Sequence, residues 1–309
     1  MDRQSSQALE GLGRYLASLN YRFTAVTPAT HQRVVQRALY AARPTLRDIF
    51  GWNAWFLRDD VPVTFDRLEK AGCIEREGIY CRSRVRFASV AEQLFVHSPF
   101  PTVATDSVFF GPDSYRFVSL IRRSLKDLDT PQTLVDIGCG SGVGGIVASH
   151  LLPGSTTVLT DINPLALSYA GINSALGRCT GVSLCQSDVL RDVQVEPSVI
   201  ISNPPYMWDA RGRSYRHGGE HMGSELSVRI LHESMERLRP GGRLVLYTGT
   251  AITQGEDYFL SCASDVLKTF RCSYTYEEID PDVFGEELLQ PGYESVERIA
   301  AVGLVVTKN

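Results

Sequence analysis

Residues 133–142 read TLVDIGCGSG, a short apolar run that ends in an aspartate and three closely spaced glycines. The run has the length and composition of a buried strand. Gly138, Gly140 and Gly142 let the backbone approach a ligand closely, because they carry no Cβ atom. In α/β proteins, a glycine-rich turn between a strand and a helix presents backbone N–H groups to a ligand. The stretch therefore predicts the first strand and the ligand-binding turn of such a fold.

Strand-like and helix-like segments alternate from this stretch to the C-terminus. The expected strands are apolar runs at 133–137, 156–161, 182–188, 198–203, 243–248 and 300–306. Helical patterns follow several of them, as at 164–176 and 224–238. Alternation of this kind specifies a parallel, doubly wound sheet. We therefore expect an α/β domain over residues 99–309.

Residues 1–98 are expected to form a smaller, mainly helical domain. Apolar residues recur at helical spacing in 5–20 and 30–42, and 65–77 also has the pattern of a helix. Two alternating runs within 78–98 predict a hairpin. Helix, helix and hairpin is the order of a winged helix, which can bind nucleic acid or cap an active site. The mixed charges of 65–77 make a poor surface for phosphates and favour the cap.

The composition is that of an ordinary folded protein, with 43% hydrophobic and 21% charged residues among 309. Seven cysteines, none in a C-x-x-C pair, indicate neither a disulfide framework nor a zinc site. No apolar run is long enough to span a bilayer, and the first residues lack the apolar core of a signal peptide. We therefore expect a cytoplasmic protein with no membrane partner.

Basic charge is slightly concentrated near the N-terminus. Residues 1–95 hold 14 Lys and Arg against 10 Asp and Glu, whereas residues 96–309 hold 17 against 25. A long nucleic acid needs a positive track along its backbone, and a balance of +4 does not supply one. The charge therefore favours a small molecule or a protein side chain over RNA or DNA as a partner.

Three aspartates stand at the ends of expected strands. Asp136 precedes the glycines, Asp161 ends the second strand and Asp188 follows the third. The glycines also fit the G-x-G-x-x-G pattern of dinucleotide-binding turns, so by themselves they leave NAD open. A carboxylate at Asp136 would repel a pyrophosphate but suits a cofactor with a sulfonium and an amino acid. Asp161 can accept two ribose hydroxyls and Asp188 an adenine amine. The three acids together describe S-adenosylmethionine better than NAD.

Four motifs agree in order with a known family: VDIGCGSG at 135–142, TDINPLAL at 160–167, CQSD at 185–188 and ISNPPY at 201–206. On these motifs the chain resembles class I S-adenosylmethionine-dependent methyltransferases. The NPPY places it beside the HemK-type release-factor glutamine methyltransferases and the adenine and guanine N-methyltransferases. The resemblance implies a Rossmann-like, seven-stranded sheet whose last strand is antiparallel. The residues expected to bind the cofactor are Asp136, Gly138, Cys139, Gly140, Gly142, Asp161, Ile162, Asp188, Val189 and Asn203.

One motif departs from the glutamine methyltransferases. Residues 109–117, FFGPDSYRF, stand where that group carries a Pro-Arg-Pro-Glu-Thr-Glu motif lining the cofactor pocket. Only Pro112 and the acidic Asp113 agree with it, which speaks against a release factor as the methyl acceptor.

The NPPY motif suits transfer to a planar nitrogen, whose delocalised lone pair makes it a poor nucleophile. The side-chain carbonyl of Asn203 and the backbone carbonyl of Pro204 can accept its two N–H hydrogens and stabilise the positive charge that develops. Tyr206 can stack on the flat group and hold it in line. We expect no strong general base, since the proton can leave after transfer. The expected catalytic residues are Asn203, Pro204, Pro205 and Tyr206.

The segment after NPPY resembles the variable substrate loop of the family. The residues expected to contact the acceptor are Tyr206, Trp208, Arg211, Arg213 and Arg216. The arginines can hold a carboxylate or phosphate, or can simply be solvated. His217 and His221 have the i, i+4 spacing of metal ligands on a helix, but the glycines between them disfavour a helix. We therefore expect no metal site.

The sequence thus predicts an S-adenosylmethionine-dependent N-methyltransferase that acts on an amide or amino nitrogen of a small molecule or protein side chain. Three alternatives stay open: an RNA or DNA base N-methyltransferase, a non-catalytic adaptor that retains the fold, and a dehydrogenase. Binding of S-adenosylmethionine or of NADH would discriminate among them.

Overall fold

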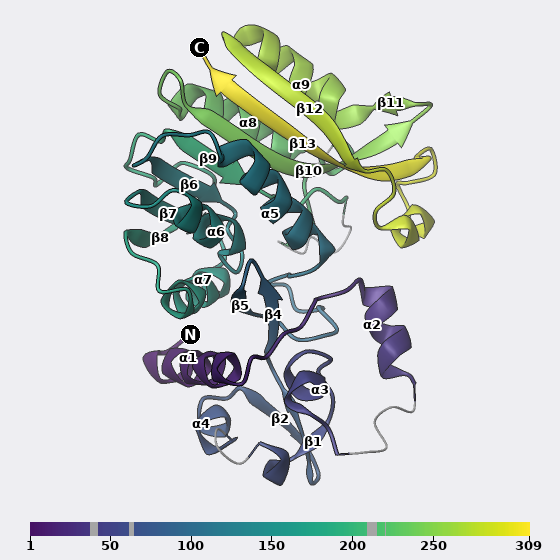
Figure 1. The fold of residues 1–309 in the computed structure, drawn as a ribbon. Coiled ribbons are helices and arrows are strands. Elements are labelled where there is room, and N and C mark those ends of the chain that lie inside the picture. Colours follow the sequence, from purple (N-terminus) through teal and green to yellow (C-terminus); the bar gives the residue numbers. More distant parts are fainter. Residues whose placement is uncertain (38–42, 62–64, 209–214, 220) are drawn as a thin grey trace.

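The computed structural model describes residues 1–37, 43–61, 65–208, 215–219 and 221–309. A large sheet with helices on both faces occupies the C-terminal two thirds of the chain, and a smaller helix-rich part lies at one end of it (Figure 1). Within the described residues, no helix is long and apolar enough to cross a membrane.

The central sheet has the order β12-β13-β10-β9-β6-β7-β8. Its strands are β6 (Thr133–Ile137), β7 (Thr156–Asp161), β8 (Val182–Gln186), β9 (Val199–Ser202), β10 (Arg243–Thr253), β12 (Cys272–Asp280) and β13 (Arg298–Lys308), with the short β11 (Glu256–Asp257) against β10. Neighbouring strands from β10 to β8 are parallel, whereas β13 is antiparallel to both of its neighbours. The predicted Rossmann-like α/β class and the antiparallel last strand of this sheet are confirmed.

The chain order creates a switch point in this sheet. From β6 the chain proceeds outward to β7 and β8, and then returns to β9 on the other side of β6. Ligands of doubly wound sheets bind beyond the carboxyl ends of the strands that flank such a point. The carboxyl ends of β6 and β9 are followed by the glycine turn and by Asn203, so the topology brings these two motifs together.

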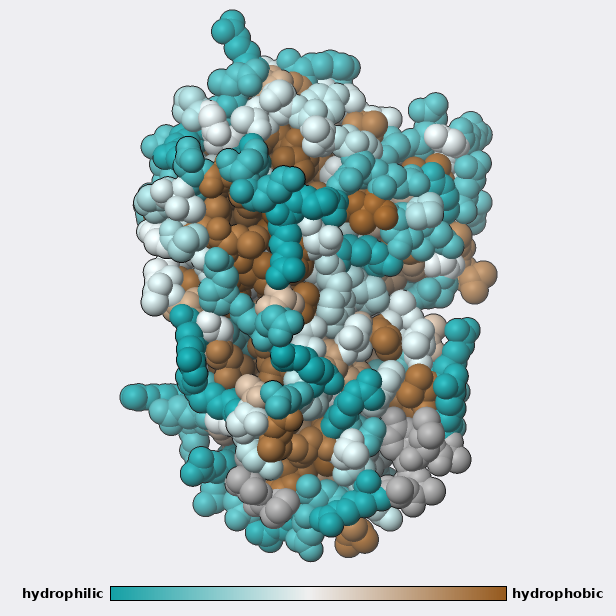
Figure 2. All heavy atoms as spheres, in the orientation of Figure 1, coloured by the Kyte–Doolittle hydropathy of each residue, from teal (hydrophilic) through white to brown (hydrophobic). Residues whose placement is uncertain are grey.

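Helices cover both faces of the sheet. They are α5 (Pro112–Leu125), α6 (Val143–Leu151), α7 (Pro164–Leu176), α8 (Glu225–Arg237) and α9 (Tyr258–Thr269), with 3₁₀ turns η3 (His221–Gly223) and η4 (Gly285–Leu289). Buried side chains of α8 and α9, such as Ile230 and Phe259, pack into one core, and those of α5 and α6, such as Phe117 and Ala148, into another. On the face drawn in Figure 2 hydrophilic side chains predominate, with hydrophobic ones gathered around α5 and α6.

The N-terminal part contains α1 (Arg3–Ser18), α2 (Pro28–Val35), α3 (Leu46–Phe50), α4 (Phe65–Lys70) and the 3₁₀ turn η2 (Arg58–Asp60). Its strands are β1 (Phe56–Leu57), β2 (Ile74–Glu77), β3 (Tyr80–Ser83), β4 (Arg86–Val90) and β5 (Gln93–His97). The predicted pairing of two runs within 78–98 is wrong, because β3 pairs with β2 and only β4 pairs with β5. The predicted helix over 65–77 is also too long. Gly72, at φ +66°, follows its end and leads into β2.

Asn173 of α7 joins the two parts. Its side chain is 1% exposed, and it both accepts from the Val96 N–H (2.8 Å) and donates to the Val96 carbonyl (3.1 Å). The same amide donates to the Ser141 carbonyl in the glycine turn (2.8 Å). One side chain thus connects β5 of the N-terminal part to the turn that follows β6.

Candidate active site

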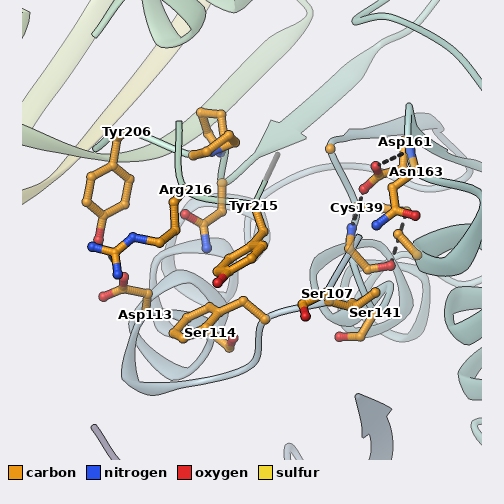
Figure 3. Close-up of a pocket in the computed structure, with 18 of the residues that line it drawn as sticks. Ser107, Asp113, Ser114, Cys139, Ser141, Asp161, Asn163, Tyr206, Tyr215 and Arg216 are labelled. Atoms are coloured by element: carbon orange, nitrogen blue, oxygen red, sulfur yellow. Dashed lines mark hydrogen bonds between the residues drawn. The ribbon is translucent and has the colours of Figure 1, made fainter. Parts of the chain in front are cut away.

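A pocket of about 460 Å³ opens at the switch point and reaches from the glycine turn to the N-terminal part. Figure 3 shows two groups of side chains in it. Cys139, Asp161 and Asn163 lie on one side, and Tyr206, Arg216 and Asp113 lie on the other. Cys139 and Asp161 on the first side belong to the predicted cofactor residues. The second side contains Tyr206 of the NPPY motif and residues near it.

The glycine turn has the backbone geometry that its sequence indicates. Gly138, Gly140 and Gly142 have φ angles of +64°, +53° and +79°, a region in which residues with a Cβ atom are strained. Gly145 lets α6 approach the sheet, because a Cβ there would lie 2.2 Å from a Leu159 methyl group. The glycine pattern therefore sets both the turn and the packing of the helix behind it.

Asp136 is a buried carboxyl, 1% exposed, directly before the glycines. One of its oxygens accepts a hydrogen bond from the Gly145 N–H at 2.7 Å. Burial raises its pKa to about 7, and the nearby Asp161 carboxylate adds to this rise. A negative charge at this position is therefore poorly compensated by the described residues around it, and a bound cation would stabilise it.

Asp161 closes β7 and supports the glycine turn from the side. Its two carboxylate oxygens accept from the Gly140 N–H and the Asn163 N–H, each at 2.9 Å. Burial raises its pKa despite these bonds. Each oxygen keeps a further lone pair for a hydroxyl donor. The adjacent Ile162 side chain lines the pocket although it is 54% exposed.

Asp188 and Val189 also line the pocket. Both oxygens of Asp188 accept from the Arg229 guanidinium of α8, at 2.9 and 3.0 Å, and this pairing lowers its pKa. Val189 has a φ of +53°, which is unusual for a β-branched residue. Strained backbone of this kind gathers at ligand sites. The neighbouring Ser187 supports the turn by donating to the Val189 carbonyl at 3.1 Å.

The NPPY segment leaves β9 from a fixed end, because Ser202 donates to the Ile137 carbonyl of β6 at 2.8 Å. Asn203, Pro204 and Pro205 then line the pocket. Among the residues that the structure describes, none hydrogen-bonds to the side chain of Asn203, which leaves its carbonyl available to a ligand. Tyr206 lies deeper, and its hydroxyl donates to Asp113 at 2.5 Å.

The loop after NPPY folds back onto the motif. The Met207 N–H donates to the Arg216 carbonyl (2.9 Å) and the Gly218 N–H to the Met207 carbonyl (2.8 Å). Gly218 and Gly223 pack directly on this backbone, since a Cβ at either would lie within 3 Å of main-chain atoms of Tyr206. These glycines therefore serve close packing. Among the described residues, no group of three His, Cys, Asp or Glu side chains is placed to hold a metal.

The predicted acceptor residues lie in different places. Arg216 lines the pocket and forms an ion pair with Glu287 at 2.7 Å. Trp208 is absent from the lining and packs its ring near Gly292, while Arg211 and Arg213 lie outside the described residues. Pocket residues that the sequence did not single out include Phe100, Phe109, Tyr215 and Phe284. Only the agreement of Asp113 with the glutamine methyltransferase motif gave a signal for its place in this pocket.

Comparisons with known proteins agree with this geometry. Residues 118–256 match the family model of the methyltransferase small domain. A release factor glutamine methyltransferase of Rhodopirellula baltica is 31% identical over 143 residues, which make up 42% of this chain and 48% of that protein. A ribosomal RNA small subunit methyltransferase C of Hahella chejuensis is 34% identical over 127 residues, 41% of this chain and 34% of that protein. The chain spans about half or less of the length of these relatives.

Two solved structures share the fold at low identity. The M. jannaschii tRNA m1G37 methyltransferase has a TM-score of 0.51 at 14% identity and covers 73% of this chain and 55% of its own. Trm5b from Pyrococcus abyssi has a TM-score of 0.51 at 16% identity, with 76% and 62% covered. The family model and the named relatives confirm the resemblance stated from the motifs. The sheet, the motifs and the matched region show that residues 118–256 of this chain are similar to the methyltransferase small domain.

Proposed function

We propose that this chain is an S-adenosylmethionine-dependent N-methyltransferase that acts on a planar amide or amino nitrogen. The observation that supports this most is the meeting of two motifs in one pocket. The buried Asp136 and the partly buried Asp161 lie on one side, and the carbonyl-bearing Asn203 and Pro204 follow the neighbouring strand.

The residues present fit this cofactor. Among the residues that the structure describes, no basic side chain hydrogen-bonds to Asp136, and its pKa is raised, so a cationic ligand gains from its charge. Asp161 presents free lone pairs at the edge of the pocket, where hydroxyl donors can reach them. When bound, S-adenosylmethionine supplies an electrophilic methyl group on a sulfonium. The chain has to hold the acceptor nitrogen in line with that methyl and orient its lone pair.

The chain's own groups suit this task. The Asn203 side-chain carbonyl and the Pro204 main-chain carbonyl accept the two hydrogens of the acceptor nitrogen. This pairing turns the lone pair away from conjugation and stabilises the positive charge that develops on the nitrogen. The released proton passes to water after transfer, so no strong base is required.

The acceptor side of the pocket is rich in aromatic rings. Phe100 and Phe109 come from the segment before α5, Tyr215 from the loop after NPPY and Phe284 from the segment before η4. The Tyr215 hydroxyl donates to the Thr102 carbonyl at 2.7 Å and joins two sides of the rim. A flat, partly apolar group fits such a lining.

We favour a small molecule or a protein side chain as the source of that nitrogen. Several arginines of the N-terminal part are engaged in ion pairs with acids, as in Arg22–Glu92, Arg58–Asp66 and Arg76–Glu69. They therefore form a weak track for a phosphate backbone. An RNA base is the second candidate, and the relatives named ribosomal RNA methyltransferase C favour it. The N-terminal part is proposed to act as a cap, because Pro28, at the start of α2, lines the pocket.

Calorimetric titration with S-adenosylmethionine, S-adenosylhomocysteine and NADH tests the proposal. We expect micromolar binding of the first two and none of NADH. Transfer of a labelled methyl group to glutamine-containing peptides, to nucleosides and to ribosomal RNA then separates the acceptor classes. Binding of NADH alone would overturn the proposal, and binding of none of the three would favour a non-catalytic adaptor.

A further inference from the structure

A buried carboxyl lies directly behind the NPPY motif. Asp113, in the first turn of α5, is 4% exposed and accepts three hydrogen bonds. The donors are the Tyr206 hydroxyl at 2.5 Å, the Tyr247 hydroxyl of β10 at 2.8 Å and the Arg116 guanidinium at 3.1 Å. Arg116 also bonds to Asp280 of β12 at 2.5 Å. Asp113 thus connects α5, β10 and the segment after β9.

The Tyr206 ring is confined as firmly as its hydroxyl. A Cβ added at Gly249 of β10 would lie 2.2 Å from two ring carbons, so the ring occupies the space that this glycine leaves. The Phe284 ring packs on another side, with centroids 6.1 Å apart. Tyr206 is therefore 7% exposed, and it is held in a single position at the edge of the pocket.

The effect of the bond between Tyr206 and Asp113 depends on the two prolines that precede Tyr206. Pro204 and Pro205 have fixed φ angles, so the backbone cannot bend freely there. They have no N–H groups, so they cannot donate hydrogen bonds to the sheet. The segment is instead fixed at its ends, at Ser202 by the bond to Ile137 and at Tyr206 by the bond to Asp113. Movement at Tyr206 would pass through the stiff prolines to the carbonyl of Pro204.

We propose that Asp113 is a positioning residue that, through the hydroxyls of Tyr206 and Tyr247, sets the orientation of the Asn203 and Pro204 carbonyls. This inference rests on the proposed function for its consequence in catalysis. Burial of Asp113 is costly by itself, and burial raises its pKa, while the three donors offset part of that cost. Asp113 acts through Tyr206.

Three variants test the proposal. Asp113→Asn leaves the hydroxyl of Tyr206 or of Tyr247 without a carboxylate acceptor. Tyr206→Phe removes the hydroxyl but keeps the ring, and Tyr276→Phe is the control. Tyr276 donates to Asp257 at 2.5 Å, a bond of the same type that lies on β12, outside the pocket lining. Amide hydrogen exchange at Met207 and Trp208 reports on the segment, because these N–H groups bond to the Arg216 carbonyl and the Tyr293 hydroxyl.

Exchange at Met207 and Trp208 is expected to be about tenfold faster in the first two variants and unchanged in the control. Affinity for S-adenosylhomocysteine should stay within about threefold, while the turnover number for methyl transfer falls about a hundredfold. Unchanged exchange in both variants would overturn the proposal, and so would faster exchange with undiminished turnover. The exchange measurement needs no acceptor, so a wild-type protein that transfers no methyl group would refute the proposed function separately.

Discussion

Asn203 is the residue whose side chain is best placed to act on an acceptor, because it lines the pocket and the described residues leave its amide free. Asn203→Ala should lower methyl transfer by about a thousandfold, as expected for the loss of a group that stabilises developing charge. Affinity for S-adenosylhomocysteine, measured by calorimetry, should stay within a few-fold. Equal loss of transfer and of cofactor affinity would contradict the catalytic role.

Asp136 is expected to reduce the stability of the ligand-free protein at neutral pH. Its carboxyl has a pKa of about 7 in the folded chain against 3.8 as the ordinary value, so the folded chain binds the proton more tightly. This group's stabilising contribution is complete below pH 3.8 and is lost as the pH rises through 7. Asp136→Asn retains an acceptor for Gly145 and removes the ionisation. It should raise the melting temperature at pH 8 by several degrees.

The comparison of melting temperatures between pH 4 and pH 8 checks this prediction. Wild type should lose more stability over that range than the variant, although Asp113 and Asp161, whose pKa values are also raised, leave some dependence in both. Identical slopes would show that Asp136 does not titrate as described. The variant should also bind S-adenosylmethionine at least tenfold more weakly, because a negative charge in the pocket that would attract a cationic ligand is lost.

Among single residues, the sequence predicted best those whose side chains come at or just after the end of a strand. Asp136, Asp161 and Asn203 line the pocket as expected. The contact between Asp113 and Tyr206, 93 residues apart, could not be predicted, because only the packing of α5 against β10 brings them together. The pairing of Asp188 with Arg229 has the same origin, since α8 delivers the arginine.

Among the elements, β10 contributes the surface against which NPPY rests. Gly249→Ala should push the Tyr206 ring out of place and lower methyl transfer by about a hundredfold, because its Cβ would overlap the ring. Gly303→Ala in the neighbouring β13 is a suitable control. Its Cβ would lie 3.1 Å from flexible methyl groups of Ile279 and Leu120, which can yield. Steady-state transfer by both variants checks the difference, and equal activities would contradict it.

Most strands of the central sheet were predictable as apolar runs, whereas in the N-terminal part only the hairpin within 78–98 was expected, and its pairing differs. Ile74–Glu77 is largely exposed and charged, so its sequence has helical features, yet Gly72 and Gly78 at positive φ set it off as a strand paired with β3. β12 was also missed. Its residues alternate weakly because most of them are exposed at the edge of the sheet.

In the whole molecule, the N-terminal part and the part that holds the central sheet share one core. Leu9, Phe87 and Phe95 belong to the same cluster of buried side chains as Ile146 of α6 and Tyr169 of α7. We therefore expect one cooperative unfolding transition in scanning calorimetry of the full chain. A fragment of residues 99–309 should aggregate, because it would expose the apolar faces of α6 and α7. Two separate transitions, or a soluble folded fragment, would contradict this expectation.

The predicted domain boundary after residue 98 rests on a change in sequence pattern. Because the two parts share one core, that pattern alone does not show where an independently folding domain begins. Composition and spacing change near that position, but they carry no information on which faces of α7 are covered by α1 and β5. Only the tertiary packing reveals that the pocket is lined from both parts.

Asn173 limits which domains can be joined to this N-terminal part in a chimeric protein. Its amide offers Val96 the donor and acceptor that a neighbouring strand would offer, and it also bonds to Ser141 beside the glycines. A chimera that grafts this N-terminal part onto another domain of this fold would thus leave the N–H and carbonyl of Val96 without their partner, unless the recipient helix carried an asparagine at the matching position. Compatibility at this side chain is therefore one condition for the graft to fold, in addition to the shared core.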